Sequence, residues 1–232
     1  MQATAIIVGA GEGKRLGGPV PKSFFPIAGR PLVLRALDRF FLARSIEKVI
    51  LVVAGTEMQR SQTLMQSDLN LSHRPWTLQV GGATRQESVR RGLEKLDPDC
   101  EIVVIHDAAR PFVSASLIDR CVDEACQAGA VVVGVPVKDT IKVVSDEHWV
   151  QATPARSSLW EIQTPQVFRK ELIVEAHDRA VRQAIDATDD STLVEQMGKP
   201  VLVLRGETTN IKITTPEDIW LAEALLRAGR AP

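Results

Sequence analysis

The stretch Ala5-Ile6-Ile7-Val8-Gly9-Ala10-Gly11-Glu12-Gly13-Lys14-Arg15, close to the amino terminus, decides the fold. Its first four residues are continuously apolar, which is typical of a strand buried on both faces of a sheet. Three glycines follow, and they let backbone N–H groups approach anionic oxygens closely. Arg15 and, a few residues later, Lys22 add positive charge. The stretch therefore predicts a phosphate-binding loop at the carboxyl end of the first strand.

This loop matches neither of two common nucleotide-binding motifs. The P-loop pattern needs glycine where the chain has Val8 and Ser or Thr where it has Arg15. The dinucleotide fingerprint G-x-G-x-x-G, begun at Gly9, needs glycine where the chain has Lys14. The sequence thus argues against a P-loop NTPase and against a Rossmann oxidoreductase, and it leaves a nucleotide phosphate site of another kind.

The composition excludes several other classes of protein. The chain has 232 residues, a formal net charge of -1 and 4% aromatic residues without tyrosine, so it lacks the basic or base-stacking surface of a nucleic-acid binder. Its three cysteines have no C-x-x-C spacing, which argues against a zinc site. No basic, apolar leader opens the chain, and no apolar run approaches the ~18 residues of a membrane helix. We expect a cytoplasmic protein without nucleic-acid or membrane partners.

Apolar runs and helical patterns alternate along the chain, which predicts an α/β fold with a mostly parallel sheet flanked by helices. We expect a single domain over residues 1–232. Residues 138–156 break the alternation with two short β-prone runs around a polar turn, which predicts a protruding hairpin arm. Strands are expected at 5–8, 49–53, 76–80, 102–106, 130–137 and 201–204, and helices at 32–41, 55–67, 84–96, 116–128, 170–184 and 215–229.

Three distant loops follow predicted strands: 9–22, 81–88 and 107–110. Ligands of open α/β sheets bind beyond the carboxyl ends of the strands, so these loops are expected to form one site. Structural roles remain open for some of their residues. Thr84 can cap the following helix, Arg85 and Arg110 can form internal ion pairs, and Asp107 can either cap its turn or sit where a metal meets phosphate.

The motifs along the chain resemble those of the 2-C-methyl-D-erythritol 4-phosphate cytidylyltransferase family. The matching segments are G-A-G-x-G-x-R-L with P-K, G-G-x-x-R-Q-x-S-V, H-D-A-A-R-P, P-V-x-D-T-I-K, Q-T-P-Q and N-I-K-I-T-x-P-E-D. They occur in the family's order from about Ala5 to Ala222. The resemblance implies a Rossmann-like nucleotidyltransferase that transfers CMP from CTP to methylerythritol phosphate with Mg²⁺, as a homodimer joined through its arms.

The resemblance also implies roles for individual residues. Catalytic cations would be Arg15, Lys22 and Lys212; the CTP site would comprise Gly9, Ala10, Gly11, Gly13, Gly82, Ser88, Asp107 and Ala108; and Arg110, Thr140, Arg156 and Thr164 would bind methylerythritol phosphate or steady its site. Asp107 would also hold the metal.

Two departures and two alternatives accompany this interpretation. Gly9 replaces the family's usual alanine, and Ala83 stands where some members carry an acid, so that backbone groups and Ser88 would read the cytosine. A related cytidylyltransferase acting on ribitol 5-phosphate is the enzyme alternative. A non-catalytic nucleotide sensor is the other, although such a protein is expected to have lost Arg15, Lys22 or Lys212.

Overall fold

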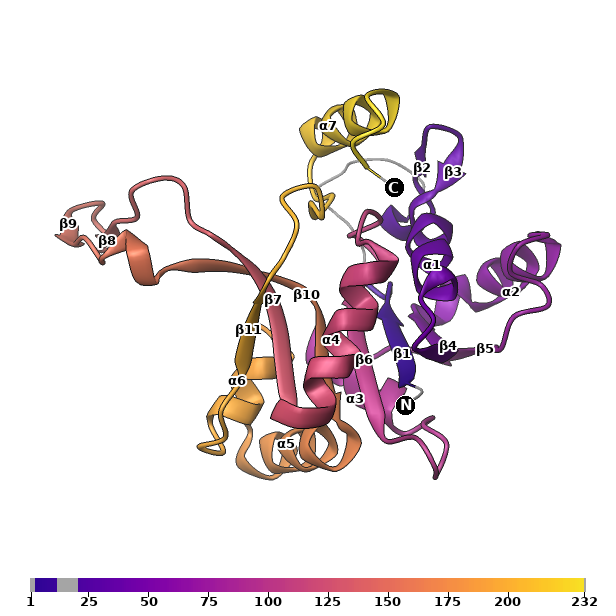
Figure 1. The fold of residues 1–232 in the computed structure, drawn as a ribbon, viewed down its shortest axis with the longest axis horizontal. Helices are drawn as coiled ribbons and strands as arrows, with labels where there is room; N and C mark the ends of the chain where they lie inside the picture. The colour runs from indigo at the N-terminus through magenta and orange to yellow at the C-terminus, as the bar shows by residue number, and fades with distance from the viewer. Residues whose placement is uncertain (1–2, 12–20, 232) are drawn as a thin grey trace.

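The computed structural model describes residues 3–11 and 21–231. At its centre lies a seven-stranded sheet of order β11-β7-β10-β6-β1-β4-β5 (Figure 1). β10 runs antiparallel to both of its neighbours, and the other neighbouring strands are parallel. The strands are β1 (Ala3–Val8), β4 (Ile46–Val53), β5 (Trp76–Val80), β6 (Ile102–Asp107), β7 (Ala130–Pro136), β10 (Trp160–Arg169) and β11 (Leu202–Arg205). The predicted mostly parallel α/β fold is confirmed.

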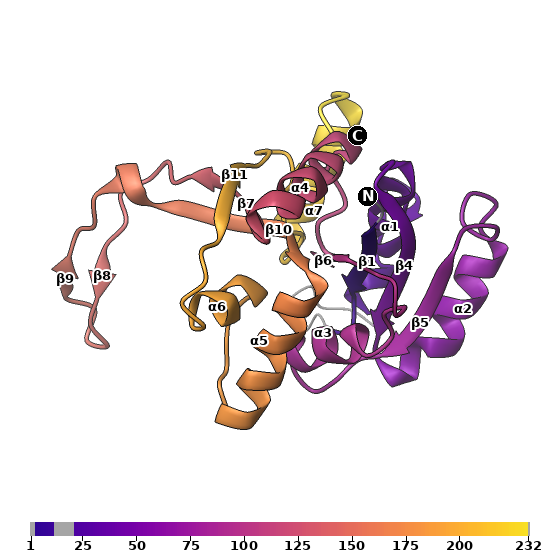
Figure 2. The same cartoon turned by 60° about the horizontal axis from the view of Figure 1, so that its bottom comes forward.

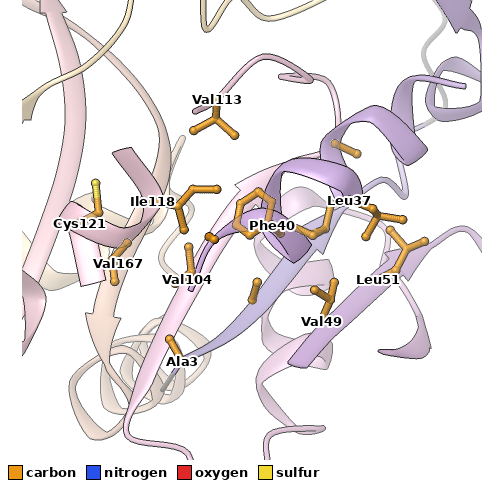
Figure 3. Close-up of a cluster of buried hydrophobic side chains, with 14 of the residues drawn as sticks. Ala3, Leu37, Phe40, Val49, Leu51, Val104, Val113, Ile118, Cys121 and Val167 are labelled. Carbon is orange, nitrogen blue, oxygen red and sulfur yellow. The ribbon is translucent and has the colours of Figure 1, made fainter. Parts of the chain in front are cut away.

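Helices cover both faces of the sheet because its strands are apolar on both sides. Along β1, Ile7 packs on one face and Ile6 on the other, and both are fully buried. Phe40 and Ile118 pack against the first face beside Val104 (Figure 3). That face is covered by α1 (Leu32–Leu42), α2 (Met58–Ser67) and α4 (Ala115–Ala128). The second face is covered by α3 (Arg85–Leu93), α5 (Lys170–Gln183) and α6 (Asp190–Glu195), three helices that lie near one another in Figure 2.

Local sequence signals set the ends of these helices. The Ser114 hydroxyl accepts from the N–H of Leu117 to begin α4, and Gly129 ends that helix at a φ of 83°, which glycine adopts without strain. Asp189 caps α6, where its side chain accepts from the N–H of Thr192. The last helix, α7 (Pro216–Arg227), begins with a capping box between Thr215 and Asp218. α3 ends at Leu93, three residues earlier than expected, and tighter turns follow it.

Residues 137–159 form the arm, which projects far from the sheet (Figure 1). Its hairpin consists of β8 (Val143–Val144) and β9 (Val150–Ala152), so the predicted arm is present, with strands shorter than the β-prone runs. The arm is exposed yet apolar: Trp149 is 75% and Val150 59% exposed. The described residues also form a further hairpin, β2 (Pro26–Ile27) with β3 (Arg30–Pro31), and the short 3-10 helices η2 (Lys22–Phe24), η3 (Gly55–Glu57) and η4 (Arg156–Ser158).

Sheet register brings the strand ends level. Val8, the last residue of β1, lies opposite Asp107 of β6 and Val52 of β4, and Val80 of β5 lies opposite Val53. The loops that follow β1, β5 and β6 therefore leave the sheet along the same edge.

Candidate functional site

A cleft of about 360 Å³ opens at this edge. The three loops predicted to converge do meet there, and a fourth segment, carrying Lys212 between β11 and α7, closes the cleft. The residues that line it include Gly9, Ala10, Gly11, Lys22, Ser23, Gly82, Ala83, Thr84, Arg85, Ser88, Asp107 and Lys212.

Two glycines beside this cleft, Gly9 and Gly81, stand where a side chain would meet close neighbours. A Cβ on Gly81 would lie 2.5 Å from Ala10 Cβ, and one on Gly9 would lie 3.1 Å from the Ser23 hydroxyl. That hydroxyl donates to the Gly9 carbonyl at 2.8 Å. Ala10 of the first loop therefore lies directly against Gly81, which leaves no room for a side chain at Gly81 and little at Gly9.

Ser88 acts inside the 81–88 loop. Its side chain is buried; its hydroxyl accepts from the N–H of Gly82 at 3.0 Å and donates to the Thr84 carbonyl at 2.8 Å. The Thr84 hydroxyl in turn accepts from the N–H of Glu87, which confirms its capping role. The side chain of Glu87 accepts from Ala83 instead of closing a capping box with Thr84. These bonds fix the loop that faces the cleft.

Asp107 lies at the centre of the charged groups. Its Oδ1 accepts from Arg85 Nε at 3.0 Å, and its Oδ2 lies 2.7 Å from Lys212 Nζ. Burial alone would raise the pKa of Asp107, but the charges of Arg85 and Lys212 and their hydrogen bonds hold this pKa well below its usual range. Asp107 is thus anionic and keeps both cations at the cleft.

Thr164 lies behind Asp107, inside the protein. Its Oγ1 accepts from the backbone N–H of Asp107 at 3.1 Å and lies 3.0 Å from Nδ1 of His106. Nε2 of His106 lies 2.9 Å from the Arg110 carbonyl, which can only accept. This chain of hydrogen bonds holds the turn between Asp107 and Arg110, so the structure places Thr164 in a supporting position rather than on the surface of the cleft.

A second cleft of about 350 Å³ adjoins the first and shares Lys212 with it. Arg110 and Lys138 also line it, together with the acidic residues Glu161 and Asp218. The loop carrying Lys212 is fixed by fully buried Asn210, whose Nδ2 donates to the Thr164 carbonyl at 2.8 Å. The backbone carbonyl of Asn210 accepts from Arg110 Nη1 at 2.8 Å, so that the predicted cation Arg110 is bound to the loop that carries Lys212.

The family model described as 2-C-methyl-D-erythritol 4-phosphate cytidylyltransferase matches residues 3–228. The chain belongs to this family. It is 43% identical to the enzyme of that name from Caldanaerobacter subterraneus subsp. tengcongensis, over 98% of this chain and all of the relative, and 44% identical to that of Desulforamulus reducens, over 96% and 95%.

Solved structures agree with this assignment. The 4-diphosphocytidyl-2C-methyl-D-erythritol synthase of Anaerococcus prevotii superposes with a TM-score of 0.87 at 33% identity, covering 97% of this chain and 96% of that one. The Thermus thermophilus 2-C-methyl-D-erythritol 4-phosphate cytidylyltransferase superposes at 0.78 and 35% identity, covering 98% and 100%. The chain is therefore a nucleotidyltransferase, and its fold is that of this cytidylyltransferase family.

The remaining residues predicted for the cytidylyltransferase site are distributed unevenly. Ala108 is buried beneath the first loop rather than lining the cleft. Thr140 and Arg156 lie on the arm, where neither lines the two clefts, and Arg156 Nη1 donates to the Lys138 carbonyl at 2.8 Å. Gly13 and Arg15 lie outside the described residues.

The side chains that line the first cleft decide whether Mg²⁺, the metal expected from the family resemblance, can bind there. Within residues 3–11 and 21–231, no group of three His, Cys, Asp or Glu side chains is placed to hold a metal ion. Asp107 is the acidic residue among the described residues that line the first cleft, and each of its oxygens already receives one cation. Mg²⁺ commonly binds one or two carboxylates together with substrate phosphates and waters. The site therefore fits Mg²⁺ when a triphosphate supplies further oxygens.

Proposed function

We propose that this chain transfers CMP from CTP to 2-C-methyl-D-erythritol 4-phosphate and releases pyrophosphate, as its family name describes. The observation that carries the proposal is the pair of adjoining clefts with Lys212 between them. A glycine-walled cleft fits a nucleotide, and a neighbouring cleft with Arg110 and Lys138 fits a second phosphate compound.

The chemistry requires no strong base. The acceptor is a phosphate monoester, which is largely dianionic at pH 7 because its second pKa is about 6. One of its oxygens attacks the α-phosphorus of CTP, the bond to the bridging oxygen of the β-phosphate breaks, and the electron pair leaves with pyrophosphate. The obstacle is the approach of two anions, so positioning and positive charge carry the catalysis.

Each predicted residue then has a task. Lys22 and Lys212, with Arg15, neutralise charge that grows on the α-phosphate and on pyrophosphate. Gly9, Ala10, Gly11 and Gly13 would present the loop backbone to the phosphates. Gly82 and Ser88 would face the cytosine, and Asp107 with Ala108 would lie at the ribose and metal region. The described members of this set, apart from buried Ala108, line the first cleft, which supports their assignment.

Asp107 would hold Mg²⁺ together with the nucleotide phosphates. When bound, the ion supplies charge neutralisation between neighbouring phosphate oxygens. The ion pairs with Arg85 and Lys212 keep the Asp107 carboxylate ionised and turned towards the cleft.

We further propose that the enzyme is a homodimer joined through its arms. Thr140 and Arg156 lie on the arm, outside both clefts of their own chain, although the family resemblance assigns them to the acceptor site. The exposed apolar residues Val143, Val144 and Trp149 support burial of this arm against a second copy. No helix among the described residues is long and apolar enough to cross a membrane; the single domain and a cytoplasmic location stay predictions.

The test is pyrophosphate release with Mg²⁺, in which CTP, UTP, ATP and GTP are crossed with methylerythritol 4-phosphate and ribitol 5-phosphate. Turnover confined to CTP with methylerythritol 4-phosphate is expected. Turnover with ribitol 5-phosphate instead would contradict the substrate assignment. CTP binding without any turnover would support the sensor alternative.

The shared site has its own test. Arg156→Ala chains mixed with Lys22→Ala chains should recover activity in mixed dimers, because one site of each mixed dimer then holds both intact residues. An inactive, confirmed mixed dimer would contradict a site built from two chains.

A further inference from the structure

A row of four side chains of alternating charge runs from the nucleotide cleft into the protein and ends at a buried histidine. Lys212 contacts Asp107, Asp107 contacts Arg85, Arg85 Nη1 donates to Asp190 Oδ2 at 2.8 Å, and Asp190 Oδ1 lies 3.2 Å from Nε2 of His177. These residues come from five segments, namely the loop before α7, the end of β6, and the helices α3, α6 and α5. Only the first three of the five residues line the cleft.

Asp190 is a rigid anchor for this row. Its side chain is 1% exposed, and its backbone N–H donates to Oε1 of Gln166 at 3.1 Å. The preceding cap, Asp189, accepts from Nε2 of the same Gln166 at 2.7 Å. The start of α6 is therefore fixed to β10, and Arg85 is held at its inner end by a group that does not move freely.

Helix stability does not explain why arginine stands at this position. Arg85 is the first residue of α3, where the positive end of the helix dipole disfavours a cation. Burial lowers the pKa of its guanidinium, and the charges of Asp190 and Asp107 reverse that effect and raise it. The planar fork of arginine donates in two directions at once, which lysine does not do.

We infer that Arg85 is a positioning residue for the proposed nucleotidyl transfer: it orients the Asp107 carboxylate and limits how strongly Asp107 holds Lys212. In the present arrangement two cations share the charge of Asp107. Without Arg85, the whole attraction of Asp107 acts on Lys212, which lies at the junction of the two clefts. The negative charge that grows on the phosphates in the transition state then competes less well for Lys212. The inference rests on the proposed function only in its kinetic consequence.

The kinetic test compares Arg85→Gln with the wild-type chain, using CTP and methylerythritol 4-phosphate. We expect kcat to fall about 10²-fold, as for a catalytic group misplaced by about 1 Å. The KM for CTP is expected to stay within about threefold, because the lost interaction acts in the transition state. Arg90→Gln is the matched control: Arg90 lies on the same helix in an exposed pair with Glu94, and its loss should leave kcat unchanged.

A second variant tests whether Asp190 acts through Arg85. Asp190→Asn should lower kcat although Asp190 lies outside the lining of the cleft. The double variant should be no slower than Arg85→Gln alone, since the two changes interrupt one chain of contacts. Arg85→Lys keeps the charge but loses the fork, and an intermediate loss of about tenfold in kcat is expected. If Arg85→Gln does not fold, Asp190→Asn and Arg85→Lys serve as the test in its place.

A readout independent of turnover separates this inference from the proposed function. The rate at which an amine-reactive acetylating reagent modifies Lys212, followed by mass spectrometry, should fall at least about threefold in Arg85→Gln because Asp107 then holds the ammonium alone. Arg90→Gln should leave that rate unchanged. A wild-type chain without turnover would refute the proposed function and leave this measurement to decide on Arg85.

Three results would overturn the inference. A kcat within about threefold of wild type together with a lower melting temperature would make Arg85 merely structural. A raised KM for CTP at constant kcat would make it a direct nucleotide ligand. An unchanged or faster rate of Lys212 modification would show that Arg85 does not weaken the ion pair between Asp107 and Lys212.

Discussion

Replacing Thr164 with valine tests the chain of hydrogen bonds behind the cleft. The change keeps the shape of a side chain that is only 5% exposed and removes its hydroxyl. Oγ1 accepts from the N–H of Asp107 at 3.1 Å. It also donates to Nδ1 of His106 at 3.0 Å, because the His106 proton resides on Nε2, facing the Arg110 carbonyl. Valine leaves two buried polar groups without their partner.

The expected loss follows from these two groups. An unsatisfied buried donor or acceptor costs about 1–3 kcal/mol, so Thr164→Val, which leaves two of them, should lower the free energy of unfolding by about 2–6 kcal/mol. Urea unfolding measures this, with an unchanged m-value as the sign that only stability has changed. Thr63→Val is the matched control. Thr63 lies exposed on α2, donates only to the Gln59 carbonyl, and its loss should cost less than about 0.5 kcal/mol.

The same variant decides between two roles for Thr164. The family resemblance predicts contact with the acceptor or support of its site, and the structure favours support. A free energy of unfolding within about 0.5 kcal/mol of wild type, combined with a raised KM for methylerythritol 4-phosphate, would refute the supporting role. It would mean that the hydroxyl serves the substrate and leaves Asp107 and His106 to other partners.

Three further outcomes are expected. Burial lowers the pKa of His106 from 6.5 to about 4, so between pH 4 and pH 6.5 the unfolded chain binds a proton at this residue and the folded chain does not. The free energy of unfolding should therefore be independent of this group above pH 6.5 and fall by about 3 kcal/mol as the pH falls from 6.5 to about 4. Urea unfolding at several pH values should show that slope, and His106→Gln should lack it. Gly81→Ala places a Cβ 2.5 Å from Ala10 Cβ and 2.9 Å from the Ser88 hydroxyl, so stability should fall by about 1–3 kcal/mol and calorimetry should show weaker CTP binding. Titration of Mg²⁺ without CTP should give no binding heat, because Asp107, the acidic residue among the described residues that line the cleft, is already paired with two cations; saturable binding by the free chain, lost in Asp107→Asn, would contradict this.

The sequence predicted those parts of the fold that follow from local pattern. Apolar runs such as Val49–Val53 become central strands because only burial on both faces suits them. Caps such as Asp189 and Thr215 mark the beginnings of helices by chemistry confined to a few residues. The prediction that three glycine- and charge-bearing loops meet at one sheet edge follows from strand direction alone, and the cleft confirms it.

What the sequence could not specify are contacts that depend on tertiary packing. Arg85 pairs with Asp107 and Asp190, which lie 22 and 105 residues away, and no spacing rule connects them. The place of β10 between β6 and β7, antiparallel to both, depends on the arm that precedes it and reverses the chain. In the same way, Q-T-P-Q does not reveal whether the Thr164 hydroxyl faces a substrate or the core. Asn210 begins the motif N-I-K-I-T-x-P-E-D, but the motif does not reveal its role, which is to fix the Lys212 loop through a buried hydrogen bond to the Thr164 carbonyl.

The position of Lys212 links these points to the reaction. A lysine on a free loop would lose side-chain and backbone entropy on meeting its substrates. Here Asn210 fixes the loop from below, the N–H of Ile213 donates to the Ala109 carbonyl at 2.8 Å, and Asp107 holds the ammonium at 2.7 Å. The charge is therefore oriented at the junction of the two clefts before either substrate binds. Such preorganisation is what a reaction between two anions needs, since it places positive charge at the point of contact without reorganisation during the reaction.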